Sequence, residues 1–200
     1  MDISARAWLY QSIISADKGS LKNHPGHSTA IAQVYSHMIM PLANKRDKET
    51  QVKWGIRDFK MRFGRDPEGM WLPETAVDIE TLETLAENDV KFTILAPHQA
   101  LRFRKIGEDW IDVQEGAIDP RIAYLCRLPS GKTISLFFFD QFKASAAAFG
   151  DLLSNGELFA NRLFERVNQI IIFRKFPVKY LILHEYGMQS SCSERLVALV

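Results

Sequence analysis

Glu74 lies where a short apolar strand is expected to give way to a helix. The turn-rich segment 65–69 precedes the apolar residues 70–72, which predict a short buried strand. Thr75 is expected to be the N-cap of the helix, with Asp78 completing a capping box. In α/β barrels, catalytic side chains gather at such corners. Glu74 is therefore either a catalytic carboxylate or a solvated glutamate favoured by the helix dipole.

The elements around this corner alternate in type, and no internal repeat or low-complexity tract interrupts them. Helices are expected at 4–16, 47–63, 77–88 and 145–167, with the last one split near Gly150 and Asn155–Gly156, and strands at 30–35, 70–72, 91–96, 122–127 and 133–139. The strands at 70–72 and 91–96, with the helix between them, predict a βαβ unit. The last two strands flank Pro129–Gly131 and predict an inserted hairpin. The fold class is therefore α/β.

The helix expected at 47–63 has an apolar stripe and a charged side. Its residues fall into two groups, with Val52, Ile56, Phe59 and Phe63 in the core and Lys48, Lys53, Arg57 and Lys60 in solvent. Gly64 is placed to end the helix. The stripe is interpreted as core, not as part of a cofactor site.

Composition excludes several functional classes. The chain has 200 residues, of which 46% are hydrophobic, and it can bury a real core. Its net charge of +1 predicts neither nucleic-acid nor anionic-membrane binding, and favours a neutral substrate. We find neither a secretion signal nor a run of about 18 apolar residues, so a cytoplasmic protein is expected. Cys126 and Cys192 predict no disulfide, and Cys126 reads as a core residue.

The histidines raise the question of a metal site. His24, His27, His37 and His98 have no regular ligand spacing, and no cysteine or acidic residue near His24 and His27 completes a tetrahedral set. We therefore expect no metal and no other cofactor, with these histidines in loops or lining a site.

Two stretches of the chain resemble glycoside hydrolase family 57, and the likeness extends over residues 15–165. Gly69–Glu74, with the run Trp-Leu-Pro-Glu, is similar to the nucleophile motif of the family, and Gly26–Ala43 is similar to an earlier region that carries a site histidine. The segments Trp54–Arg57 and Ile94–Ala100 also recur in a poorly characterised bacterial branch. The resemblance implies part of a glycoside hydrolase/deacetylase-type (β/α) barrel that acts on α-glucan or related oligosaccharides with retention of configuration.

The resemblance also implies roles for single residues. Glu74 falls on the nucleophile position, and His37 on a site-lining position. Trp71, His98 and Asp140 are the other candidates for substrate binding. Trp71 has the alternative of packing in the core, and Asp140 that of capping the next helix.

The chain also departs from the family pattern. It contains no Asp-Gly-Glu motif, where the resemblance places the acid/base aspartate, and no early His-Gln-Pro motif. We expect an incomplete barrel over residues 1–167, followed by a divergent tail at 168–200. The alternatives are a non-catalytic remnant, a fragment completed by a partner, or a metal-assisted deacetylase or mannosidase-like enzyme.

Overall fold

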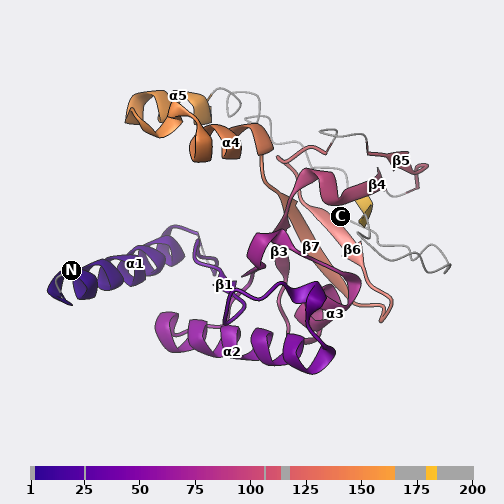
Figure 1. Cartoon of the computed structure of the whole chain (residues 1–200), viewed down its shortest axis with the longest axis horizontal. Coiled ribbons are helices and arrows are strands. Elements are labelled where there is room, and N and C mark those ends of the chain that lie inside the picture. Colours follow the sequence, from indigo (N-terminus) through magenta and orange to yellow (C-terminus); the bar gives the residue numbers. More distant parts are fainter. Residues whose placement is uncertain (1–2, 25, 106, 114–117, 165–178, 184–200) are drawn as a thin grey trace. The chain divides into compact units, whose positions relative to one another are not determined.

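The computed structural model describes residues 3–24, 26–105, 107–113, 118–164 and 179–183 (Figure 1). The chain divides into two compact units between Thr93 and Ile94. Both units combine helices with strands, as the α/β assignment predicts.

Unit 1 is built around a short parallel sheet. Its elements in chain order are α1 (Ile3–Asn23), β1 (Ala32–Gln33), α2 (Lys45–Phe63), β2 (Met70–Trp71) and α3 (Ile79–Glu87). β1 pairs with β2 in parallel, with Ala32 opposite Met70. Gly69 forms a parallel bridge with Phe92 at the start of β3 (Phe92–Leu95). The parallel βαβ unit predicted from the sequence is thereby confirmed.

The first helix is longer than predicted. α1 continues through Gly19 and ends at Asn23 instead of Ala16. A glycine inside a helix costs only about 1 kcal/mol relative to alanine, so a tertiary contact can outweigh it. Here Asp17, which is buried, accepts a hydrogen bond from Arg65 at 2.8 Å. This contact holds the last turns of α1 against the rest of unit 1.

α2 ends where its sequence predicts and begins two residues earlier than predicted, at Lys45. Asn44 caps it by accepting a hydrogen bond from the Asp47 backbone N–H at 3.0 Å, and Gly64 ends it in a left-handed conformation with φ of 70°. Val52 and Phe59 are buried. The core of the unit is completed by Met70 and Leu72 near β2, and by Leu82 and Leu85 of α3.

The sequence prediction is wrong about Lys48, which it assigned to the solvated side of α2. The structure buries it to 1% exposure, with Nζ 2.7 Å from Asp78 Oδ2 and 2.6 Å from Glu80 Oε2. Lys48 precedes Val52 by four residues and therefore lies on the apolar stripe. Spacing determined its face, and two acidic partners from another element make its burial tolerable.

The start of α3 also differs from the prediction. Asp78, and not Thr75, is the N-cap, and its side chain accepts a hydrogen bond from the Thr81 backbone N–H at 2.8 Å. Pro73–Thr75 forms a 3-10 turn of its own. The helix is thus delayed by a turn that holds Glu74 apart from it.

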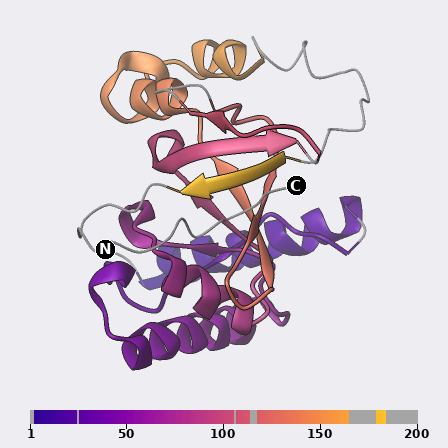
Figure 2. The same cartoon turned by 90° about the vertical axis from the view of Figure 1, so that its right-hand side faces the viewer.

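Unit 2 contains most of a six-stranded sheet, whose order is β3-β7-β6-β8-β4-β5. The strands after β3 are β4 (Ala100–Lys105), β5 (Ile111–Asp112), β6 (Tyr124–Arg127), β7 (Thr133–Phe138) and β8 (Lys179–Leu183). β6 and β7 pair antiparallel, which confirms the predicted hairpin. β8 runs antiparallel beside β4 (Figure 2).

β4 and β5 were not predicted. In β4 the guanidinium groups of Arg102 and Arg104 lie over the ring of Trp110, 5.8 and 4.6 Å from its centroid. The predicted break in the last helical region is confirmed, since α4 (Gln141–Phe149) and α5 (Gly156–Phe164) are separate helices.

The cysteines and the tail complete the comparison with the sequence. Cys126 is buried in β6, as expected for a core residue. Cys192 lies outside the described residues, as does most of the predicted tail. Among the described residues, no helix has the length and apolar character needed to cross a membrane.

Candidate active site around Glu74

Glu74 sits in a turn with unusual backbone geometry. Both Glu74 and Thr75 have positive φ angles, 55° and 53°. For non-glycine residues, and for β-branched threonine above all, this region is sparsely populated and costs about 1–3 kcal/mol per residue. The turn is closed by hydrogen bonds from the Thr75 N–H to the Leu72 carbonyl and from the Ala76 N–H to the Pro73 carbonyl, both 3.0 Å.

The surroundings of this turn hold it in the strained form. Leu72 and Pro73 are buried, whereas the Glu74 side chain is 69% exposed. Buried residues before Glu74 thus support a carboxylate that points outward. Strain that the surrounding structure maintains is found at functional sites, and this observation favours a functional Glu74.

His37 contacts Glu74 from the neighbouring strand connection. His37 Nε2 lies 3.0 Å from Glu74 Oε1, and the His37 side chain is 71% exposed. A carboxylate only accepts hydrogen bonds, so the imidazole donates through Nε2 in this contact. The two residues are 37 positions apart in the sequence and follow β1 and β2, which are adjacent parallel strands.

The loop that carries His37 is fastened to α2. The Ser36 N–H and hydroxyl both donate to Gln51 Oε1, at 2.8 and 2.9 Å, and the Tyr35 N–H donates to the Gln51 carbonyl at 3.1 Å. Gly55 allows this approach, since a Cβ at that position would lie 2.2 Å from the Gln33 carbonyl oxygen. α2 therefore positions the chain just before His37.

The chain that follows the Glu74 turn is held by Asp78, which bonds to Lys48 and Thr81. Burial of Asp78 opposes its charged form, but hydrogen bonds from Lys48 and Thr81 outweigh this and lower its pKa. Burial likewise disfavours the charged form of Lys48, and its hydrogen bonds to Asp78 and Glu80 outweigh burial and raise its pKa. Both groups are charged at neutral pH, so an ion-pair cluster anchors the residues that follow Glu74.

The other predicted site residues lie at strand ends as well. Trp71 is half-buried in β2, three residues before Glu74. His98 is exposed in the 3-10 turn Pro97–Gln99 after β3, and Asp140 follows β7; both belong to unit 2. Asp140 is the N-cap of α4 and accepts a hydrogen bond from the Lys143 N–H at 3.2 Å, so the capping alternative is confirmed.

The remaining histidines have individual partners. His27 Nδ1 lies 2.8 Å from Glu68 Oε1, and His24 Nδ1 lies 3.2 Å from the Ser20 carbonyl oxygen. In the part of the chain that the structure describes, no three histidine, cysteine or acidic side chains form a cluster that could hold a metal ion.

Three residues that shape this site were missed by the sequence prediction. Gln51 and Gly55 hold the His37 loop, and Lys48 holds Asp78. All three are buried residues of α2. The sequence did carry a signal for these residues, because all three lie on the apolar stripe of the predicted helix. A glycine there indicates a close backbone, and a glutamine or lysine there needs a polar partner.

In this chain, parallel strands lead into connecting turns and alternate with helices. This arrangement is that of an incomplete α/β barrel. The chain belongs to glycosyl hydrolase family 57, whose sequence model matches residues 12–142. No match was found among curated proteins.

The chain is also similar in part to proteins of solved structure. A 4-alpha-glucanotransferase from Thermococcus litoralis matches with 14% identity over 88% of this chain and 31% of its own, at a TM-score of 0.55. An alpha-amylase from Thermotoga maritima matches with 18% identity over 68% of this chain and 24% of its own, at a TM-score of 0.46. Of these two, the glucanotransferase overlaps closely enough to show a common fold. The chain spans 24% to 31% of the length of these two proteins.

Proposed function

We propose that this chain is the nucleophile-bearing part of a carbohydrate-active enzyme, which acts on α-glucan-like oligosaccharides by retaining hydrolysis or transglycosylation. The observation that carries the proposal is the strained turn that presents Glu74 to solvent beside His37. Membership of the family supports the assignment, since the matched range includes both residues.

In this proposal the carboxylate of Glu74 attacks the anomeric carbon and forms a glycosyl ester, while the bond to the leaving oxygen breaks. A second carboxyl group, about 5–5.5 Å from the first, protonates the leaving oxygen and then deprotonates the incoming water or sugar hydroxyl. His37 donates to Oε1 of Glu74, so Oε2 remains available for attack. His37 therefore orients the nucleophile, and Trp71 is the proposed substrate contact beside it. Substrate binding by His98 and Asp140 stays a prediction.

The second carboxyl group is not assigned to a residue of this chain. The sequence contains no Asp-Gly-Glu motif, and Asp140 is engaged as a helix cap. The same observation favours a second candidate function, a non-catalytic remnant that a partner segment completes. Residues 1–167 as the barrel part and 168–200 as a divergent tail stay a prediction.

The test is a turnover assay on maltooligosaccharides. It compares the chain with a version extended through the flanking reading frames, each with and without Glu74→Gln. In the extended form, Glu74→Gln should lower kcat by more than about 10³-fold. The exposed Glu87 at the end of α3 gives a matched control, since Glu87→Gln should leave kcat unchanged.

A second measurement tests whether Glu74 acts as the nucleophile. Azide should restore turnover to Glu74→Ala and yield a glycosyl azide of inverted configuration, because the small anion takes the place of the missing carboxylate. Full activity of Glu74→Gln would overturn the assignment. Folded protein without turnover in any form would favour the non-catalytic candidate.

A further inference from the structure

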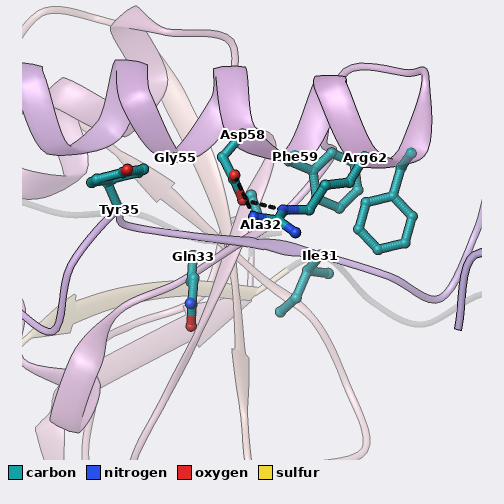
Figure 3. A pocket seen from close by; sticks show the side chains of 9 residues that line it. Ile31, Ala32, Gln33, Tyr35, Gly55, Asp58, Phe59 and Arg62 are labelled. Carbon is teal, nitrogen blue, oxygen red and sulfur yellow. Dashed lines mark hydrogen bonds and ion pairs between the residues drawn. The ribbon is translucent and has the colours of Figure 1, made fainter. Parts of the chain in front are cut away.

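A pocket of about 560 Å³ lies in unit 1 between β1 and α2, and the chemistry proposed for Glu74 does not use it (Figure 3). Its size is in the range of small-molecule sites, about 300–1,000 Å³. The lining combines charged, polar and aromatic side chains with apolar ones, among them Ile31, Gln33, Tyr35, Asp58, Phe59 and Arg62.

The centre of the pocket is an ion pair with no net charge. Arg62 Nε and Nη2 donate to the two carboxylate oxygens of Asp58 at 2.7 and 2.8 Å. The hydrogen bonds from Arg62 lower the pKa of Asp58, so the pair is charged at neutral pH. The side chains of Arg62 and Asp58 remain 50% and 40% exposed. Tyr10 of α1 also hydrogen-bonds Arg62, and the remaining guanidinium donors and carboxylate acceptor positions are open to a ligand.

An exposed aromatic ring lies beside this ion pair. In Figure 3 Tyr35 is drawn on one side of the Asp58–Arg62 pair, and the ring of Phe59, which is buried, overlaps the Arg62 side chain. Tyr35 is 54% exposed and contacts the ring of Trp54, itself 53% exposed, with centroids 5.3 Å apart and planes at 85°. A contact of this kind fixes the tyrosine ring without covering it.

The chemistry of the lining selects among ligands. An anion gains little, since Asp58 already neutralises Arg62, and a purely apolar ligand would strip water from an ion pair without replacing its hydrogen bonds. A neutral molecule rich in hydroxyl groups satisfies both parts, because its hydroxyls bond to the ion pair and its C–H face lies on the exposed Tyr35 ring.

We propose that this pocket is an auxiliary binding site for a neutral oligosaccharide, with Tyr35 as the stacking platform and Asp58 and Arg62 as hydroxyl partners. The choice of an α-glucan as ligand rests on the proposed function. Tyr35 lies two residues before His37, on the loop that α2 fastens. The site therefore holds a glucan beside the loop that carries His37, the hydrogen-bond partner of Glu74.

The test uses the indole N–H signal of Trp54 in NMR spectra of the full chain. The chain has four tryptophans, so Trp54→Phe identifies the signal, and Trp8, which is 71% exposed on α1, serves as an internal control. Titration with maltohexaose in a Glu74→Gln background, which suppresses turnover, should shift the Trp54 signal and leave that of Trp8 in place.

The variants assign the effect to the pocket. Tyr35→Ala and Asp58→Asn should each raise the Kd for maltohexaose by about tenfold or more, and Tyr35→Phe should keep most of the affinity because the ring remains. The control is Glu49→Gln, which removes the equivalent ion pair with Lys53 on α2, outside the pocket, and should leave Kd unchanged. Unaltered signals of the other tryptophans establish that each variant is folded.

The outcomes separate this proposal from the function of Glu74. A Trp54 shift that depends on Tyr35 and Asp58 supports the pocket even where no turnover is found. Turnover that depends on Glu74, without any Trp54 shift at about 10 mM maltohexaose, overturns the pocket and leaves the nucleophile assignment in place. A shift that survives both Tyr35→Ala and Asp58→Asn overturns it as well.

Discussion

Lys48→Met tests whether the buried ion-pair cluster stabilises unit 1. Methionine keeps most of the volume of the lysine stem and removes its charge. The substitution deletes two hydrogen bonds, of 2.7 Å to Asp78 and 2.6 Å to Glu80. Breaking a fully buried ion pair costs about 3–5 kcal/mol, because the remaining charge has no partner.

The structure lowers this expectation. The side chains of Asp78 and Glu80 are 35% and 47% exposed, so water can solvate both carboxylates after Lys48 is removed. We therefore expect a loss of about 1–2 kcal/mol in the free energy of unfolding, in the range of one hydrogen bond to a charged group. For a chain of this size, this corresponds to a fall in Tm of about 2–8 °C.

The effect should also depend on pH. The pKa of Asp78 is lowered in the fold, so its contribution is present above the ordinary value of 3.8 and is lost as pH falls through the folded value. The pKa of Lys48 is raised, so its contribution is present below 10.5 and is lost as pH rises through the folded value. The difference between wild type and Lys48→Met should therefore be largest between these limits.

Thermal and urea unfolding followed by circular dichroism measure this difference. Lys53→Met is the matched control, because Lys53 lies on the same helix and its side chain is 58% exposed in a surface pair with Glu49. It should leave the Tm almost unchanged. A Lys48→Met chain as stable as wild type, or a control that loses as much, would refute the reasoning.

Three further predictions concern the backbone and one more ion pair. Gly64→Ala should destabilise the chain by about 1 kcal/mol because Gly64 has φ of 70°. Gly19→Ala, in open space inside α1, should stabilise it by about 0.5–1 kcal/mol. Changes in Tm of the same sign for the two variants would contradict this. Gly55→Ala should cost about 1–3 kcal/mol in urea unfolding, since its Cβ would meet the Gln33 carbonyl oxygen at 2.2 Å, and wild-type stability would exclude the close approach. The hydrogen bond from Arg65 lowers the pKa of Asp17, so the stability that this contact contributes should be lost as pH falls from about 4 through the folded value. A wild-type Tm profile against pH that matches the profile of Asp17→Asn would contradict this.

Local patterns in the sequence were sufficient for several elements. The position of α2, its glycine end, the parallel βαβ unit and the hairpin of β6 and β7 all agree with the prediction. Each depends on residues close together in the chain, namely apolar spacing, a turn signal or a cap. The predicted N-cap at Thr75 failed for the same reason, since Asp78 offers an equally good local cap and only packing decides between them.

By itself, the sequence placed Glu74 after an apolar strand and His37 after another, and associated both with one family. Only the tertiary structure decided that these residues meet at 3.0 Å, that Glu74 and Thr75 adopt positive φ, and that Lys48 is buried between two carboxylates. The physical reason is that periodicity sets the face on which a side chain lies. Which distant groups share that face depends on strand pairing and close packing, and no local pattern encodes these.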